Sequence, residues 1–273
     1  MTKLADAHVL VTGGSAGIGL ATARLALAHG ARVSLVARDP ERLASAAAGL
    51  EAGIGDPTRV AAEPADVTDP TALEQAVLLL TTQFGPVDVL VANAGAAVPG
   101  HFEDFDASVF EDQMQLNYFG TLHAIRAVVP SMISRGAGHI LVVSSDAGIV
   151  GVYGYSAYSP TKFAVRGLAE TLRAELKPFG IVVSCAFPPD TDTPGLAAED
   201  STKPEATKRI SEGVRVRTAD EVARAIVRGI ERDRLVITAD PSSAVLARTA
   251  GLIAPFVRRS MDRHVRKAPR APQ

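Results

Sequence analysis

The stretch HVLVTGGSAGIG, residues 8–19, decides the fold. Its first five residues form a short β-branched run that predicts a buried strand, and its glycine-rich remainder leads into an Ala- and Leu-rich helical pattern ending near Gly30. Glycines permit positive φ angles and close backbone approach, and the start of a helix offers free N–H groups. The stretch therefore predicts a phosphate-binding strand–loop–helix unit. The alternative is a tight turn that binds nothing.

Strands and helices alternate along the rest of the chain. Further strands are predicted at 31–37, 59–62, 87–91, 138–144, 181–187 and 234–238. Helices are predicted at 40–50, 70–84, 107–135 and 218–232, with another that carries Tyr158 and Lys162 and ends near 178. Such alternation indicates βαβ units, a parallel sheet covered on both faces and right-handed crossovers. We therefore expect a single-domain α/β fold of the doubly wound Rossmann type, with a seven-stranded parallel sheet flanked by helices.

The domain organisation follows from the same pattern. No internal segment has the composition of a linker, so residues 1–240 are predicted to form one domain. The section between 188 and 217 is proline-rich and is predicted to be irregular. Residues 241–273 lie outside the alternation and are predicted to form a C-terminal helical extension with a basic tail.

Composition excludes several classes of function. The 273 residues are 47% hydrophobic and carry a net charge of −2, so no global field attracts nucleic acid. The single Cys185 rules out an internal disulfide framework, and the six histidines show no metal-ligand spacing. Neither a signal peptide nor an apolar run of about 20 residues is present in the sequence. We expect a cytoplasmic protein without a metal or a nucleic-acid partner.

Tyr158 and Lys162 are candidates for acid–base chemistry. They lie four residues apart, so a helix presents both side chains on one face. A phenol has a pKa of about 10, and an ammonium group beside it is expected to lower that pKa. Amphipathic helices produce this spacing by chance. The pair therefore becomes informative only with a dinucleotide site and a second polar group beside the phenol.

The end of the second predicted strand indicates which dinucleotide is bound. A site for NAD places an acidic residue there to bind the ribose hydroxyls. This strand instead ends in Arg38, whose guanidinium suits the 2′-phosphate of NADPH. Asp39 follows one residue too late for the ribose position. NADPH is the expected cofactor, with a solvated surface charge as the alternative role of Arg38.

Several motifs, in order from about residue 5 to 240, together resemble the short-chain dehydrogenase/reductases. They are Thr12-Gly13-x-x-x-Gly17-Ile18-Gly19, Asp66-Val67, Asn93-Ala94-Gly95, Asn117, Ser145 and Tyr158-x-x-x-Lys162. The resemblance implies that Ser15 and the glycine loop bind the cofactor and that Asp66 contacts the adenine. It also implies that residues 93–95 support the adenine-ribose side. Taken singly, Asp66 and residues 93–95 are equally well explained as strand-end turn residues.

The same resemblance implies a catalytic set of Asn117, Ser145, Tyr158 and Lys162. Ser145 is expected to polarise a carbonyl oxygen that takes a proton from Tyr158. Lys162 is expected to lower the pKa of Tyr158 and to hold the nicotinamide ribose. In this family the residue at Asn117 holds a water that relays protons to the lysine. An exposed polar residue is the alternative for Asn117, and the adjacent Ser144 is expected to pair or cap the strand end.

The stretch FPPDTDTPG, residues 187–195, departs from the family pattern. Pro188-Pro189 replaces the usual Pro-Gly, which removes a backbone donor and stiffens the loop. The cofactor-binding set implied here comprises Pro188, Thr191 and Thr193, with Thr193 on a cofactor phosphate. Together with TKPE at 202–205 and YSPTKFAVRGLAE at 158–170, this stretch resembles the 3-ketodihydrosphingosine reductases.

That resemblance implies the NADPH-dependent reduction of the 3-keto group of a long-chain keto-lipid in sphingolipid synthesis. Two alternatives remain open. One is a reductase of another apolar ketone, such as a 3-oxoacyl thioester or a steroid, and the other is a non-catalytic NADPH-binding sensor. Members of this family commonly pair through the helices that carry Asn117 and Tyr158, which implies a homodimer or homotetramer.

The C-terminal stretch has an apolar side and a basic end. At helical period one face contains Val245, Leu246, Leu252, Ile253 and Phe256, while Arg248, Arg258 and Arg259 lie outside that arc. Arg263, Arg266, Lys267 and Arg270 follow, opposed only by Asp262. This pattern is typical of a helix on an anionic membrane surface, so peripheral membrane contact is one expectation. Pro255 interrupts this helix, and the apolar face is short. The alternative expectation is therefore that the helix closes the pocket or forms an oligomer contact.

Overall fold

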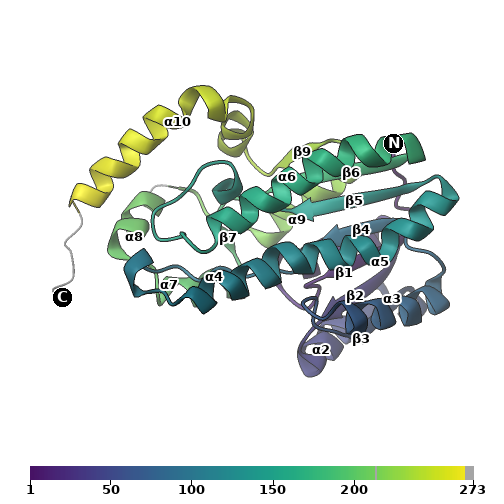
Figure 1. The fold of residues 1–273 in the computed structure, drawn as a ribbon. Helices are drawn as coiled ribbons and strands as arrows, with labels where there is room; N and C mark the ends of the chain where they lie inside the picture. Colours follow the sequence, from purple (N-terminus) through teal and green to yellow (C-terminus); the bar gives the residue numbers. More distant parts are fainter. Residues whose placement is uncertain (213, 268–273) are drawn as a thin grey trace.

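Seven strands form one parallel sheet in the order β3-β2-β1-β4-β5-β6-β9 (Figure 1). In this computed structural model, residues 1–212 and 214–267 are described. The order reverses between β1 and β4, which places the topological switch point beside β1 and confirms the predicted Rossmann-type fold. The strands are β1 (His8–Thr12), β2 (Arg32–Ala37), β3 (Val60–Pro64), β4 (Val89–Ala92), β5 (Gly138–Val143), β6 (Ile181–Phe187) and β9 (Val236–Thr238).

Helices cover both faces of the sheet. On one face lie α1 (Gly17–Ala28), α2 (Pro40–Ile54) and α9 (Ala219–Glu231). The other face carries α3 (Pro70–Phe84), α5 (Gly120–Arg135) and α6 (Ser159–Leu176). Successive strand residues point to opposite faces, so Val9 and Val11 join one core cluster while Leu10 joins the other. Because both faces are buried, the strands are continuous apolar runs.

The predicted helix at 107–135 is interrupted. It consists of α4 (Ala107–Met114), a π-helical turn (Gln115–Phe119) and α5. The turn contains Asn117, whose carbonyl oxygen accepts a hydrogen bond from the Thr121 hydroxyl at 2.8 Å. Single π turns of this kind are frequent at functional sites. Asn117 is therefore held in the part of the helix where regular geometry is broken.

The section between β6 and α9 is not irregular as predicted. It contains β7 (Thr191–Asp192), α7 (Pro194–Asp200), α8 (Glu205–Ser211) and β8 (Arg217–Thr218), and β7 pairs in parallel with β8. Elements this short contain too few turns to show a hydrophobic period, so the sequence pattern missed them. Short helical turns complete the connections elsewhere: η1 (Pro57–Arg59), η2 (Phe102–Asp104), η4 (Asp146–Gly148) and η5 (Lys177–Phe179).

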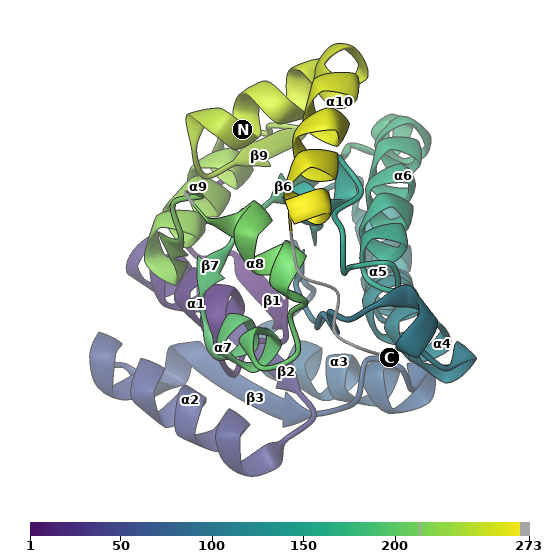
Figure 2. The ribbon, with the colours of Figure 1, turned by 90° about the vertical axis from the view of Figure 1, so that its left-hand side faces the viewer.

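The last helix, α10 (Pro241–Lys267), starts near β9 and is bent (Figure 2), and its outer part extends beyond the body of the protein (Figure 1). Asp240 caps its start by accepting hydrogen bonds from the backbone N–H groups of Ser242 and Ser243. It contacts β9, α8 and η4. The side chains of Ile253, Arg266 and Lys267, and all of Arg270, lie outside the described residues. Within the described part of the chain, no helix has the length and apolarity needed to span a membrane.

Candidate active site

A cavity of about 740 Å³ opens at the carboxyl ends of the strands. Its walls come from the loops after β1, β2, β4, β5 and β6, together with α6 and α7. This is the edge at which open parallel sheets bind ligands, because loops from both sides of the switch point meet there. Most of the predicted site residues line the cavity: Gly13, Ser15, Gly17, Ile18, Arg38, Asn93, Ala94, Gly95, Ser145, Tyr158, Lys162, Pro188, Thr191 and Thr193.

Five predicted residues support the cavity without lining it: Thr12, Gly19, Asp66, Val67 and Asn117. The Thr12 hydroxyl accepts hydrogen bonds from the N–H groups of Asn93 and Ala94, at 3.1 and 3.2 Å. A Cβ at Gly19 would lie 2.4 Å from the Gly13 carbonyl oxygen, so only glycine fits there. These residues therefore fix the positions of the loops that line the cavity.

The glycine loop forms an anion-binding end of the cavity. Gly13 and Gly17 adopt positive φ angles of 65° and 54°. The N-cap of α1, Ala16, makes no side-chain hydrogen bond to the first N–H groups of the helix. These donors face the cavity with the positive end of the helix dipole, which suits a pyrophosphate. The geometry of the loop is compatible with the predicted phosphate-binding unit, and phosphate binding stays a prediction.

Two arginines stand where the second strand ends. Arg38 lines the cavity with its side chain 69% exposed, and its guanidinium lies 3.8 Å from the Asp66 carboxylate. Arg42 lines the same end and was not predicted from the sequence, although its position one helical turn after Arg38 is a usable signal. Asp39 caps α2 by accepting from the Arg42 N–H at 3.0 Å, which directs its carboxylate to the helix. This end is thus cationic and fits a 2′-phosphate.

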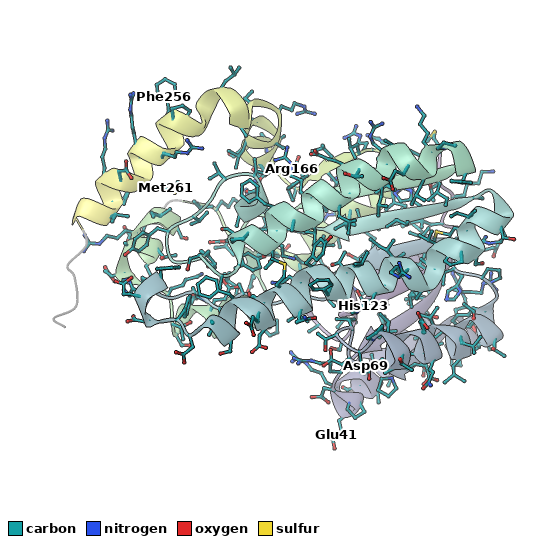
Figure 3. The ribbon with its side chains drawn as sticks, viewed as in Figure 1. Glu41, Asp69, His123, Arg166, Phe256 and Met261 are labelled. Carbon is teal, nitrogen blue, oxygen red and sulfur yellow. The ribbon has the colours of Figure 1, made fainter. Side chains whose placement is uncertain are left out.

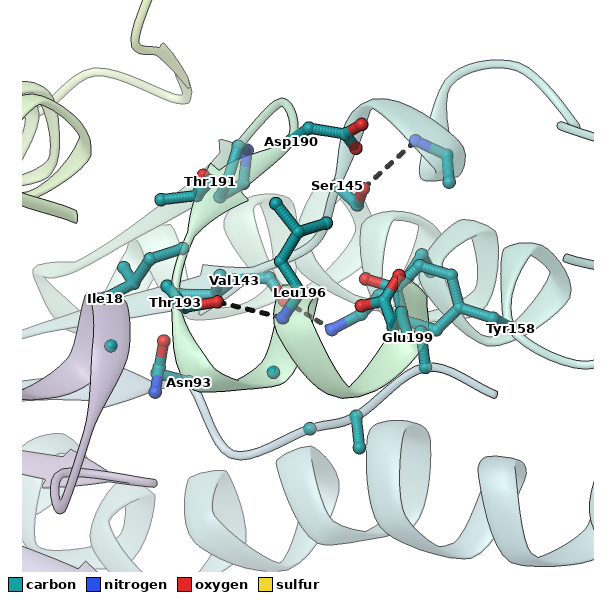
Figure 4. Close-up of a pocket in the computed structure, with 18 of the residues that line it drawn as sticks. Ile18, Asn93, Val143, Ser145, Tyr158, Asp190, Thr191, Thr193, Leu196 and Glu199 are labelled. Atoms are coloured by element: carbon teal, nitrogen blue, oxygen red, sulfur yellow. Dashed lines mark hydrogen bonds between the residues drawn. The ribbon is translucent and has the colours of Figure 1, made fainter. Parts of the chain in front are cut away.

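Ser145, Tyr158 and Lys162 all line the cavity. Figure 4 shows Ser145 and Tyr158 among the side chains around it. Ser145 follows the end of β5; its hydroxyl accepts a 3.2 Å hydrogen bond from the Ala147 N–H and lies close enough to the Tyr158 phenol to affect its pKa. The Lys162 ammonium lies 5.6 Å from the centre of the Tyr158 ring and donates a 3.0 Å hydrogen bond to the Val143 carbonyl. The Ser144 hydroxyl instead donates to the backbone carbonyl of Lys162 at 2.8 Å, so its side chain contacts α6 and does not cap the strand end.

The expected lowering of the phenol pKa is wrong for this arrangement. Burial raises the pKa of Tyr158, its hydrogen bond with Ser145 lowers it in part, and the Glu199 and Asp190 carboxylates raise it further. Burial also lowers the pKa of Lys162 to about 8. The ammonium faces a carbonyl and not the phenolic oxygen, so it does not offset the desolvation of the phenol. Tyr158 is therefore protonated at neutral pH and can act as a proton donor.

Asn117 occupies a buried supporting position. Its side chain is fully buried, donates to the Ala96 carbonyl and accepts from the Ala96 N–H, both at 3.0 Å. The alternative of an exposed polar residue is wrong. A Cβ at Gly95 would lie 2.7 Å from the Asn117 amide oxygen and 3.3 Å from the Lys162 ammonium, so only glycine lets the two approach here. The role of Asn117 in a proton relay stays a prediction.

The loop after β6 closes over the glycine loop. Thr193 caps α7 by accepting from the Leu196 N–H at 3.2 Å. Its methyl group lies so near Gly17 that a Cβ there would approach it to 3.0 Å. Thr191 is buried, and its hydroxyl donates to the Pro189 carbonyl at 2.7 Å. Helix α7 is thereby fixed between the anion-binding end and the far end of the cavity.

The far end of the cavity combines carboxylates with apolar side chains. The Tyr155 hydroxyl donates a 2.7 Å hydrogen bond to Glu199, and burial raises the pKa of the Glu199 carboxyl. Asp190 lies close enough to raise the pKa of Tyr155 and Tyr158. These acidic residues were not predicted from the sequence, because no motif marks them. Apolar residues complete this end: Val152, Leu196, Ile210 and Val214.

Asp146, next to Ser145, is another residue of the cavity wall that was not predicted. One of its carboxylate oxygens accepts a 2.6 Å hydrogen bond from the Ser243 hydroxyl of α10. The other is buried without a hydrogen-bond partner among the described residues. Burial, together with the nearby Asp240 and Asp190 carboxylates, raises the pKa of Asp146 to about 6.

Comparisons with known proteins agree with this geometry. The family model described as short chain dehydrogenase matches residues 7–204. The chain is 43% identical over 253 residues to a 3-dehydrosphinganine reductase of Danio rerio, covering 92% of this chain and 76% of that protein. It is 44% identical over 227 residues to a 3-ketodihydrosphingosine reductase of Bos taurus, covering 82% and 68%. A solved short-chain dehydrogenase from Sphingobium yanoikuyae, in complex with NADPH, shares 30% identity with a TM-score of 0.77, covering 97% and 98%.

The raised pKa of Asp146 predicts a measurable pH dependence of stability. Its folded pKa of about 6 exceeds the ordinary 3.8, so between these values the folded protein binds more protons than the unfolded chain. Stability therefore falls as pH rises through this window. Asp146→Asn, which cannot ionise, is expected to raise the free energy of unfolding by up to about 3 kcal/mol at pH 8 and by about half of that at pH 5.

Urea unfolding followed by circular dichroism at both pH values measures this difference. Asp112→Asn, at an exposed position in α4, is the matched control and is expected to show no comparable gain. A gain for Asp146→Asn that is the same at pH 5 and pH 8 would contradict the assignment.

Proposed function

Since the chain belongs to the short-chain dehydrogenase family, we propose that it uses NADPH to reduce the 3-keto group of 3-ketodihydrosphingosine. The enzyme class follows from the family, and the substrate and the strict choice of NADPH are the proposal. The observation that carries it is the pairing of carboxylates with apolar side chains at the far end of the cavity, beside the proton donor Tyr158. The names of the Danio rerio and Bos taurus relatives support the same substrate.

The residues at the anion-binding end fit NADPH. The uncapped N-terminus of α1 suits its pyrophosphate, and Arg38 with Arg42 suits its 2′-phosphate. Lys162 is the residue proposed to bind the nicotinamide ribose. When bound, this cofactor supplies the hydride that reduces the ketone. The protein supplies the position of the ketone and the proton.

Ser145 and Tyr158 are proposed to act together on the carbonyl oxygen of the substrate. Each lines the cavity and carries a hydroxyl, and the two side chains are near enough for Ser145 to lower the pKa of the Tyr158 phenol. As negative charge develops on the carbonyl oxygen, the two donors stabilise it, and Tyr158 transfers its proton. Because an alkoxide is a stronger base than a phenolate, a phenol with a raised pKa still gives up its proton. The high pKa also keeps Tyr158 protonated between turnovers.

The far end of the cavity favours a substrate with an amino group and a long chain. Glu199 and Asp190 are partly buried and carry negative charge when ionised. The positive charge of a protonated amine beside the ketone compensates the negative charges of these two carboxylates. Val152, Leu196, Ile210 and Val214 offer an apolar wall for the chain. A steroid or a 3-oxoacyl group places no cation against these carboxylates. A non-catalytic sensor has no need of the Ser145, Tyr158 and Lys162 arrangement.

Tyr158→Phe tests the proton donor. The change removes only the phenolic oxygen, so we expect kcat for 3-ketodihydrosphingosine to fall on the order of 10²- to 10⁴-fold, with the Kd for NADPH nearly unchanged. Lys162→Ala is expected to lower kcat and also to raise the Kd for NADPH. Steady-state rates and fluorescence titration of NADPH measure the two quantities. Near-normal turnover by Tyr158→Phe would exclude this mechanism.

Arg38→Asp tests the choice of cofactor. The substitution removes a charge-assisted contact and adds repulsion against the 2′-phosphate, so kcat/KM for NADPH is expected to fall about 100-fold. The value for NADH is expected to change much less. Arg42→Ala is expected to act in the same direction with a smaller effect. Equal losses with both cofactors would indicate that Arg38 serves only the structure.

Glu199→Gln tests recognition of the amine. The amide still accepts the hydrogen bond from Tyr155 but carries no charge, so we expect KM for 3-ketodihydrosphingosine to rise about 10- to 100-fold. For a long-chain 3-ketone without the amino group, we expect Glu199→Gln to have a kcat/KM no lower than that of the parent enzyme. Glu74→Gln, at an exposed position in α3, is the control. Equal losses with the two ketones would argue against an amine site.

A further inference from the structure

The helix α10 has one side that packs on the protein. Leu246, Ala247 and Ala250 lie against the core cluster that also contains residues of α3, α5 and α6. The Ser243 hydroxyl bonds to Asp146, and the helix contacts α8. From the sequence, Leu246 was expected on the same face as Val245, Leu252 and Phe256. The structure separates them, because Leu246 belongs to the packed side.

The opposite side of α10 exposes large apolar side chains. Val245, Leu252 and Phe256 are 55%, 79% and 68% exposed. Phe256 points away from the body of the protein, whereas Met261 points towards it (Figure 3). Because α10 is bent, its faces are compared only within each part of the helix. Leu252 and Phe256 lie four residues apart in the sequence, a spacing that places both on one side of a helix. We call Val245, Leu252 and Phe256, with the arginines described next, the outward face.

Arginines occupy the same side of the helix. At 3.6 residues per turn, Arg259 and Arg263 fall within about 60° of Phe256 in the outer part of the helix. Arg248 lies three residues after Val245 in the first part, so these two also share a side. All three are exposed. Arg248 and Arg259 were expected outside the apolar arc because that arc was centred too far towards Leu246. Residues 241–265 contain four arginines and one aspartate, Asp262.

We propose that the outward face of α10 binds an anionic membrane surface. Apolar side chains reach the boundary between headgroups and acyl chains, while arginines on the same side pair with anionic headgroups. The charge pattern favours a lipid surface over a second copy of the chain. A twofold contact through this face would place the arginines of one copy, Arg248, Arg259 and Arg263, near those of the other, and like charges repel.

The outward face is attached to the part of the protein that takes the substrate. Helix α10 contacts α8, and Ile210 and Ser211 of the α8 segment line the far end of the cavity. Binding of α10 to a bilayer therefore brings that end close to the lipid. Vesicle binding does not depend on the proposed function, whereas its use for substrate uptake rests on the proposed function.

Co-sedimentation of the full chain with vesicles tests the proposal. We expect binding to vesicles of phosphatidylcholine with 30 mol% phosphatidylglycerol, little binding to phosphatidylcholine alone, and release in 0.5 M NaCl. Leu252→Gln with Phe256→Gln is expected to raise the Kd at least tenfold. Arg248→Gln, Arg259→Gln and Arg263→Gln together are expected to raise it on the order of 100-fold, or about fivefold for each arginine.

The control is Leu78→Gln with Leu79→Gln, which removes two exposed leucines, 66% and 56% exposed, from α3. It is expected to bind vesicles like the parent protein. Absence of binding by the parent, or equal losses in the α3 and α10 variants, overturns the proposal. Light scattering that shows the mass halved by the Leu252 and Phe256 changes also overturns it, because the face then binds a second copy.

Reduction of 3-ketodihydrosphingosine in detergent micelles separates the two proposals. The α10 variants are expected to keep this activity, because the outward face lies outside the cavity. Vesicle binding by a parent protein that reduces no such substrate refutes the proposed function and leaves the membrane surface standing. Activity without vesicle binding refutes the membrane surface and leaves the proposed function standing.

Discussion

The charge of Lys162 is the constraint around which the site is built. Its side chain is almost completely buried, and a buried ammonium is tolerated only with hydrogen-bond partners. The Val143 carbonyl at the end of β5 is one such partner. The surrounding backbone must come very close, which is why glycines border this residue. A Cβ at Gly95 would lie 3.3 Å from the Lys162 ammonium. A Cβ at Gly148 would lie 2.7 Å from the backbone carbonyl oxygen of Lys162.

Much of the fold follows from local pattern. The strands are short apolar runs, and they alternate with helices that have caps such as Asp39, Asp69 and Thr218, so their order in the sequence predicts the sheet. The glycine loop and the Tyr158–Lys162 spacing likewise depend only on neighbours in sequence. Strand ends differ from the predicted ones by at most two residues, since pairing in the sheet sets them. The predicted strand 87–91, for example, begins at Val89 in the structure.

The remainder depends on contacts between distant segments. Tyr155, Asp190 and Glu199 meet at one end of the cavity although they come from three different segments. Glu199 belongs to the short helix α7, and Tyr155 and Asp190 lie in loops, so no hydrophobic period marks any of them. The pKa of Tyr158 had the opposite sign from the prediction because burial and remote carboxylates outweigh the neighbouring lysine. Spacing along a helix indicates which side chains share a face, but not how much solvent they lose or where an ammonium points.

The hydrogen bond from Ser243 to Asp146 joins the start of α10 to the residue beside Ser145. The Ser243 hydroxyl has one proton and faces two carboxylates, Asp146 at 2.6 Å and Asp240 at 3.1 Å, so it can serve only one of them at a time. A ligand whose binding shifts that proton between the two carboxylates therefore affects both the start of α10 and the cavity wall at Asp146. If binding at α10 changes the affinity of the cavity for its ligand by some factor, thermodynamic reciprocity requires that filling the cavity change the affinity at α10 by the same factor.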